Sequence, residues 1–98
     1  MSLKFGLKEE LIYEIVSFAK KYDVEKLIIF GSRARGDYKE RSDIDLAVKG
    51  GDVQGFSLSV DEEASTLLRF DILDLGSELK EELLESIAKE GIIIYEKV

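Results

Sequence analysis

The stretch IIFGSRARGDYKERSDIDLAV, residues 28–48, decides both the fold and the chemistry of this 98-residue chain. It begins as an apolar run, turns at Gly31-Ser32 and crosses a polar loop with three arginines. It then returns to an apolar run that contains Asp43 and Asp45. Residues two apart in a strand point to the same face. The two aspartates therefore share one face of the expected strand, while the residues between and after them point into the core.

The paired aspartates Asp43 and Asp45 indicate a metal site. Two neighbouring carboxylates raise each other's pKa unless a cation lies between them. Mg²⁺ is the natural cation, because it takes oxygen ligands from carboxylates and phosphates. A lysine or an arginine is the alternative partner. A third acid, Asp71, lies in the expected strand RFDILDL and faces the pair if the two strands are adjacent. Three such carboxylates suffice for two metal ions about 3.5–4 Å apart.

The Gly31-Ser32 turn predicts a phosphate-binding site. Glycine lets a backbone N–H approach a phosphate closely, and a helical turn that begins there points further N–H groups at it. The Ser32 hydroxyl can donate to the same phosphate. The Walker pattern is absent, because no Lys-Ser or Lys-Thr pair follows the glycine. A plain turn with Ser32 as a helix N-cap is the structural alternative.

Hydrophobic periodicity predicts one domain over residues 1–98, with the element order α-β-β-α-β-α-β. Helices are expected over residues 7–22, 56–68 and 77–90. Strands are expected over residues 24–30, 43–48, 69–75 and 92–97. Ser77 is the expected N-cap of the last helix, and Gly91 is its stop signal. A short helical turn over residues 32–36 is expected to end in a left-handed conformation at Gly36.

Composition narrows the function classes. The net charge of −7, from 14 basic and 21 acidic residues, argues against direct nucleic-acid binding and against an anionic membrane surface. A basic protein partner or a metal-bound nucleotide is easier to accommodate. Cysteine and histidine are both absent, which excludes thiolate and histidine metal sites and cysteine nucleophiles. No signal peptide or membrane-spanning stretch is visible, so we expect a cytoplasmic protein.

Gly31-Ser32, ten residues and then Asp43-x-Asp45 resemble the signature of the nucleotidyltransferase superfamily that includes DNA polymerase beta. The longer string GSRARG…SDIDLAV resembles its smallest members, the minimal nucleotidyltransferase (MNT) domains, and the resemblance covers essentially the whole chain. It implies an α/β (α+β) fold in which helices flank a small mixed sheet of about four strands. It also implies transfer of a nucleoside monophosphate, most readily AMP, from a nucleoside triphosphate to an acceptor hydroxyl.

The resemblance assigns roles to single residues. The implied catalytic and metal-binding residues are Asp43, Asp45 and Asp71, which would hold two Mg²⁺ ions. Gly31 and Ser32 would bind the triphosphate. Asp71 matches the third carboxylate of the family better than Asp74, which lies near the end of its strand.

The two arginines of the polar loop, Arg33 and Arg35, have two open interpretations. One of them reaches a phosphate, which the planar guanidinium matches well. Alternatively, both form salt bridges that hold the loop over the acids. We expect Arg33 to contribute to nucleotide binding.

Minimal members of the family often pair with a helical HEPN-domain protein as toxin and antitoxin. The MNT protein is then the antitoxin, and some of them AMPylate the toxin on a tyrosine. For this chain the resemblance implies ATP as substrate, a HEPN-domain partner protein, and a homo- or hetero-oligomer. Two other functions stay open: a non-catalytic antitoxin that masks its partner, and a catalytic subunit that needs a separate acceptor-binding subunit.

Overall fold

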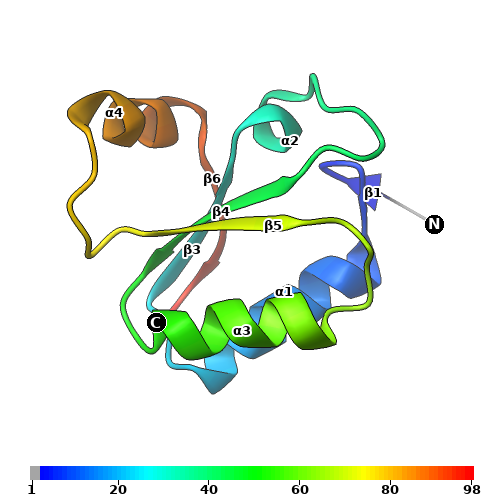
Figure 1. Ribbon diagram of the computed structural model, residues 1–98, viewed down its shortest axis with the longest axis horizontal. Helices are drawn as coiled ribbons and strands as arrows, with labels where there is room; N and C mark the ends of the chain where they lie inside the picture. Colours follow the sequence, from blue (N-terminus) through cyan, green and yellow to red (C-terminus); the bar gives the residue numbers. More distant parts are fainter. Residues whose placement is uncertain (1–2) are drawn as a thin grey trace.

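The computed structural model describes residues 3–98, in which a four-stranded mixed sheet carries helices on both faces (Figure 1). The strands are β3 (Lys26–Phe30), β4 (Ile44–Lys49), β5 (Phe70–Asp74) and β6 (Ile92–Glu96), in the spatial order β5-β4-β3-β6. β4 and β5 are parallel, whereas β3 is antiparallel to both β4 and β6. This architecture confirms the small mixed sheet that the sequence predicted.

The main hydrophobic core lies between the sheet and the helices α1 (Glu9–Lys21) and α3 (Val53–Glu63), which cover one of its faces (Figure 1). Alternate residues of the strands and one stripe of each helix point into this layer. The buried side chains are Leu7, Leu11, Ile15, Ala19, Val24, Leu27, Ile29, Ile44, Leu46, Val48, Phe56 and Val60. Each large apolar side chain buried here stabilises the fold by about 1.5–3 kcal/mol.

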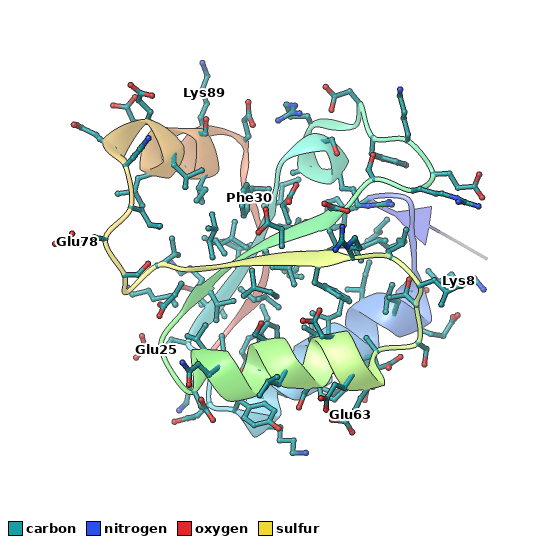
Figure 2. The ribbon with its side chains drawn as sticks, viewed as in Figure 1. Lys8, Glu25, Phe30, Glu63, Glu78 and Lys89 are labelled. Atoms are coloured by element: carbon teal, nitrogen blue, oxygen red, sulfur yellow. The ribbon has the colours of Figure 1, made fainter. Side chains whose placement is uncertain are left out.

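The opposite face of the sheet carries α2 (Ser32–Arg35) and α4 (Glu81–Glu90) (Figure 1). Ile87 of α4 is buried. The chain passes from α4 into β6 at Gly91, where a Cβ atom would lie 2.6 Å from the Ile28 side chain. Figure 2 shows Phe30, the last residue of β3, between α2 and α4. On this face, α4 therefore covers one region of the sheet, and α2 lies next to another.

The N-terminus forms a hairpin that the sequence analysis did not predict. β1 (Leu3–Lys4) pairs with β2 (Leu7–Lys8), and the intervening Phe5 and Gly6 both have positive φ angles, of 59° and 70°. Positive φ at both turn residues is the usual geometry of a two-residue hairpin. The helix expected from residue 7 therefore begins at Glu9, because residues 7 and 8 are paired in β2.

Two other helix predictions were wrong at their ends. The helix expected over residues 56–68 runs from Val53 to Glu63, with Asp52 accepting a 3.0 Å hydrogen bond from the Gly55 N–H at its start. It stops because Ala64 is extended, with φ −66° and ψ 139°. α4 begins at Glu81, so Ser77 is not its N-cap. The Ser77 hydroxyl instead donates to the Asp74 carbonyl oxygen at 2.6 Å.

α1 is the longest helix in the described part of the chain, with 13 residues. Across residues 3–98, no helix has both the length and the apolar character that crossing a bilayer requires.

Candidate functional site

Asp45 and Asp71 lie side by side on the face of the sheet that carries α2 and α4. The parallel register of β4 and β5 pairs Asp45 with Asp71, and paired residues on adjacent strands point to the same side. Asp43 immediately precedes β4 and lies two residues before Asp45. Asp45 is half-buried, whereas Asp43 and Asp71 are exposed. The fold thus brings the three predicted carboxylates to one end of β4 and β5.

Asp74 is separated from these acids by the strand geometry. It is paired with Val48, which is buried in the core layer, three residues after Asp45. An odd spacing reverses the face of a strand. The Asp74 carboxylate also accepts a 2.8 Å hydrogen bond from the Gly76 N–H. Of the two acids in RFDILDL, Asp71 is therefore the one that faces Asp45.

The three aspartates form a negative cluster that the nearby arginines offset only in part. Burial raises the pKa of Asp45, and the neighbouring charges of Asp71 and Asp43 raise it further, while Arg35 and Arg33 act in the opposite direction. Across residues 3–98, none of the three forms an ion pair with a basic side chain. A half-buried carboxylate surrounded by like charges is a position where a cation stabilises the fold.

The donor set fits Mg²⁺ in chemistry, although the ligands are not already gathered around one point. Within residues 3–98, no three Asp, Glu, His or Cys side chains form a ready-made metal cluster. The candidate ligands are all carboxylate oxygens, the hard donors that Mg²⁺ prefers. Two of the three, Asp43 and Asp71, are exposed side chains.

Gly31 brings the backbone of the turn directly against Asp45. It follows β3 with φ 73° and ψ −155°, and a Cβ atom at this position would collide with a carboxylate oxygen of Asp45. Only glycine combines that positive φ with so close an approach. Within residues 3–98, no hydrogen bond involves the Ser32 hydroxyl, so it is free to donate. As predicted, the turn ends in a left-handed conformation at Gly36, with φ 94°.

Arg33 is buried, with 2% of its surface exposed, and its guanidinium is bonded to the backbone. It donates four hydrogen bonds of 2.8–3.2 Å to the carbonyl oxygens of Phe5, Glu40 and Ser42. Its guanidinium carbon also lies 5.1 Å from the centre of the Tyr38 ring. These contacts join α2 to the loop that leads into Asp43 and to the N-terminal hairpin. The alternative in which this arginine holds the loop is therefore confirmed for Arg33, although through hydrogen bonds to backbone carbonyls in place of salt bridges. Nucleotide binding by Arg33 stays a prediction.

Arg35 occupies a different environment from Arg33. Its side chain is 44% exposed and forms ion pairs with Glu90, at 3.1 Å, and with Asp37, at 3.3 Å. Its backbone N–H bonds the Gly31 carbonyl one helical turn back, so the two residues share a face of α2. Exposed ion pairs contribute at most about 1 kcal/mol, so Arg35 can exchange them for a phosphate.

A family model and a curated relative both match this chain over most of its length. The model described as "Polymerase beta, Nucleotidyltransferase" matches residues 13–98, which include every candidate site residue. The relative is "Putative protein adenylyltransferase MJ0604" of Methanocaldococcus jannaschii. It is 35% identical over 100 aligned positions, which cover 90% of this chain and 98% of the relative.

Two solved structures share the fold. A toxin-antitoxin structure with AMP-PNP matches with a TM-score of 0.71 at 19% identity, over 88% of this chain and 73% of that chain. A mutant of the toxin-antitoxin MntA-HpeT, in which two aspartates two positions apart are changed to glutamate, matches with a TM-score of 0.70. Its identity is 17%, over 88% of this chain and 73% of that chain. At such low identity the similarity shows the common fold alone.

Proposed function

This chain belongs to the polymerase beta nucleotidyltransferase family, and we propose that it transfers AMP from Mg²⁺-bound ATP to a hydroxyl group of a partner protein. The family membership makes the chain a nucleotidyltransferase. The choice of ATP, of Mg²⁺ and of a protein hydroxyl as acceptor belongs to the proposal. It is supported by the name of the adenylyltransferase relative and by the chemistry of the residues at the site.

The close approach of Gly31 to Asp45 is the observation that carries this proposal. It places a backbone turn able to bind phosphate beside a half-buried carboxylate that repels its neighbours. The like charges of the neighbouring carboxylates oppose folding. A metal-bound triphosphate would offset this repulsion, since its cation neutralises the acids, and its phosphate oxygens would accept hydrogen bonds from the turn.

Each residue of the site has a distinct role in the proposed reaction. Asp43, Asp45 and Asp71 would hold two Mg²⁺ ions, which when bound neutralise charge on the α-phosphate and on the leaving pyrophosphate. The Gly31 backbone and the Ser32 hydroxyl bind the triphosphate. Arg35 is the arginine whose donors can turn to the phosphates, because those of Arg33 are bonded to the loop.

The transfer step is an in-line displacement at the α-phosphorus. The acceptor oxygen forms a bond to that phosphorus, while the bond from the phosphorus to the bridging oxygen breaks. Pyrophosphate leaves with the bonding electron pair. Asp71 takes the proton of the acceptor hydroxyl and returns it to solvent, so the products are the AMP ester, pyrophosphate and one proton.

The proposed biological setting is a toxin–antitoxin pair in which this chain is the antitoxin and a HEPN-domain protein is the toxin. The similarity to two toxin-antitoxin structures supports this setting. The acidic chain, with a net charge of −7, suits a partner with a basic surface. AMP transfer to the partner, or stable binding to it, would then neutralise the toxin.

Calorimetric titration of ATP, with and without Mg²⁺, tests the nucleotide site. The parent protein should bind ATP in the presence of Mg²⁺ only, and Asp43→Ala/Asp45→Ala should not bind under either condition. Circular dichroism of the double variant should show an intact fold. Metal-independent binding, or full affinity in the variant, would contradict the assignment of these residues.

A non-catalytic antitoxin that masks its partner is the second candidate. The lack of a ready-made metal cluster among residues 3–98 favours it, because a vestigial site would also look this way. Co-expression of the toxin with Asp43→Ala/Asp45→Ala distinguishes the two functions. Masking predicts that the variant still neutralises the toxin, whereas AMP transfer predicts that neutralisation is lost.

A further inference from the structure

The N-terminal hairpin of β1 and β2 precedes the part of the chain that the family model matches, which begins at residue 13. It is nevertheless anchored in the fold, because Leu7 is buried in the main core and Phe5 packs against that core. Figure 1 shows β1 beside the loop of residues 36–43 that joins α2 to β4, which we call the Asp43 loop. The hairpin therefore lies next to the segment that leads into the proposed metal site.

One guanidinium connects the hairpin to the Asp43 loop. Arg33 donates from Nη1 to the Phe5 carbonyl oxygen at 2.9 Å. Its Nε and Nη2 atoms both donate to the Ser42 carbonyl oxygen, at 3.1 and 2.8 Å. The donors of a guanidinium point in fixed directions within one plane. A displacement of the Phe5 carbonyl therefore moves the plane that holds Ser42, the residue directly before Asp43.

Tyr38 and Gly6 hold this guanidinium from two further sides. The Tyr38 ring, which belongs to the Asp43 loop, has its centre 5.1 Å from the guanidinium carbon of Arg33. A Cβ atom at Gly6 would collide with the Tyr38 ring and would lie 2.9 Å from Arg33 Nη1. Gly6 also has a φ of 70°, which favours glycine. A larger residue at this position fits only if the ring or the guanidinium moves.

The backbone is held by hydrogen bonds on both sides of Asp43. On one side, the Ser42 carbonyl accepts the two bonds from the guanidinium, and on the other the Ile44 N–H donates to the Arg69 carbonyl oxygen at 2.8 Å. Inside the loop, the Ser42 hydroxyl accepts from the Lys39 N–H at 2.8 Å. The Ser42 N–H donates to the Lys39 carbonyl oxygen at 3.0 Å. The loop is thus a closed turn whose position follows that of the guanidinium.

The position of this backbone matters for metal binding because the Asp43 side chain is exposed. Packing does not fix its carboxylate, so the approach of that carboxylate to Asp45 depends on where the backbone lies. Groups that orient a metal ligand without touching the metal typically change metal affinity by about 10–100-fold when they are removed. A contact that holds the Asp43 loop should therefore be measurable as metal affinity.

We propose that the N-terminal hairpin positions Asp43 for metal binding, with Gly6 and Tyr38 as positioning residues that act through Arg33. This inference rests on the proposed function for the metal ion. The link between the hairpin and the Asp43 loop can be measured separately, in the metal-free protein.

Gly6→Ala and Gly50→Ala form a matched pair of variants for the link. Both glycines have positive φ, of 70° and 76°, and a Cβ atom at either would meet a side chain. Gly50 directly follows β4, at the end of the strand away from Asp43, and its neighbour is the exposed side chain of Glu25. In amide spectra of the metal-free ¹⁵N-labelled proteins, Gly6→Ala should shift the Ser42 and Asp43 resonances. Gly50→Ala should leave both in place.

Electron paramagnetic resonance titration with Mn²⁺, a spectroscopic substitute for Mg²⁺, measures the consequence for the metal site. The Kd for Mn²⁺ should rise about tenfold or more in Gly6→Ala and in Tyr38→Ala, and should change less than about twofold in Gly50→Ala. Tyr38→Phe keeps the ring and should keep the affinity of the parent protein. Thermal unfolding should show comparable losses of stability in the two glycine variants, which separates the metal effect from folding.

Three results would overturn this inference and leave the proposed function intact. The first is unshifted Ser42 and Asp43 amides in Gly6→Ala. The second is an unchanged Kd for Mn²⁺ in Tyr38→Ala, a variant that tests the link even if Gly6→Ala does not fold. The third is an equal loss of Mn²⁺ affinity in Gly6→Ala and Gly50→Ala, which would reduce the effect to stability. A parent protein that does not bind Mn²⁺ would instead overturn the proposed metal site, and this inference with it.

Discussion

Asp45 of β4 is paired with Asp71 of the parallel strand β5, so two carboxylates of like charge lie next to each other on one face of the sheet. This pairing is the structural basis of the site. It joins two segments 26 positions apart in the sequence, and the neighbouring charges contribute to the raised pKa of Asp45. Four predictions follow from this arrangement and from the turn beside it.

The first prediction concerns the pH dependence of stability. Burial and the charges of Asp71 and Asp43 raise the pKa of Asp45 in the folded state above its unfolded value, which is about 3.9. The folded protein then binds this proton more tightly than the unfolded chain does. The contribution of Asp45 to stability is therefore full below about pH 4 and is lost as the pH rises through the folded-state pKa.

Urea denaturation of the metal-free protein and of Asp45→Asn measures this contribution. The stability advantage of Asp45→Asn should grow as the pH rises from about 4, and saturating Mg²⁺ should reduce the advantage at pH 7, since the cation stabilises the ionised parent. A difference between the two proteins that does not change with pH would show that Asp45 is not destabilised by its neighbours.

The second prediction distinguishes the two acids of β5. Asp71→Asn should lower the rate of AMP transfer by about a thousandfold or more, because a metal ligand supplies several kcal/mol of transition-state stabilisation. Asp74→Asn should keep the rate within a few-fold, since Asp74 faces the other side of the strand. The readout is radiolabelled AMP on the acceptor protein. If both variants lose a comparable fraction of the AMP-transfer rate, Asp71 does not have the metal-binding role proposed for it.

The third prediction concerns the close approach of Gly31 to Asp45. Gly31→Ala places a Cβ atom against the Asp45 carboxylate and should abolish ATP binding. Gly36→Ala is the matched control, because Gly36 also has a positive φ but nothing lies within 4 Å of its Cβ position. The left-handed conformation of Gly36 should cost Gly36→Ala about 1–2 kcal/mol. Gly31→Ala should lose about 1–3 kcal/mol more, from the steric conflict and because φ 73° with ψ −155° is a conformation that only glycine adopts readily.

Calorimetric titration with ATP and thermal unfolding provide the two measurements for these glycine variants. We expect Gly36→Ala to bind ATP with nearly the affinity of the parent protein. We expect Gly31→Ala not to bind ATP. If Gly31→Ala still binds ATP, the Gly31-Ser32 turn is not part of the triphosphate site.

The fourth prediction separates the two arginines of α2. Arg33→Ala should destabilise the protein by about 2–4 kcal/mol, because it removes a buried side chain and the four hydrogen bonds that it donates to backbone carbonyl oxygens. Arg35→Gln should leave the melting temperature nearly unchanged and lower ATP affinity about tenfold, since the lost contact is one charge-assisted bond to phosphate. Affinity for AMP should change little.

Glu90→Gln is the control for the fourth prediction. It breaks the ion pair between Arg35 and Glu90, one of the two that Arg35→Gln breaks, but keeps the arginine. The affinity of this variant for ATP should therefore equal or exceed that of the parent protein. An equal loss of ATP affinity in both variants would mean that the ion pair only braces α2 against α4. If Arg33→Lys keeps its stability but loses ATP affinity, the predicted nucleotide-binding role of Arg33 is confirmed.

Much of the fold could be predicted from local patterns. The four strands of the main sheet lie within about two residues of their predicted positions, because each has a short apolar run bounded by glycine or charged residues. The failures occur at the ends of helices, where a hairpin or an extended residue interrupts the periodic pattern. Leu7 fits a helical stripe but pairs with Lys4 in a hairpin, and Leu67 fits α3 but follows an extended Ala64.

The sequence predicted the residues of the candidate site but not the hydrogen bonds that hold its loop in place. Spacing alone placed Asp43 and Asp45 on one side, and the Gly31-Ser32 turn near a strand end. The sequence contains no comparable signal for Arg33, whose acceptors lie 7 to 28 positions away along the chain. A long-range hydrogen-bond network of this kind exists only once the chain has folded.

The sequence by itself determined which residue types the candidate site offers, because residue types and short spacings are local properties. A turn with glycine and serine, two aspartates at strand spacing and the absence of histidine and cysteine leave oxygen ligands and phosphate as the consistent choice. The tertiary structure decided that Asp71 lies beside Asp45, that Arg33 is buried and that Arg35 is partly exposed. These features depend on the parallel register of β4 and β5 and on burial, which arise only when distant segments pack together.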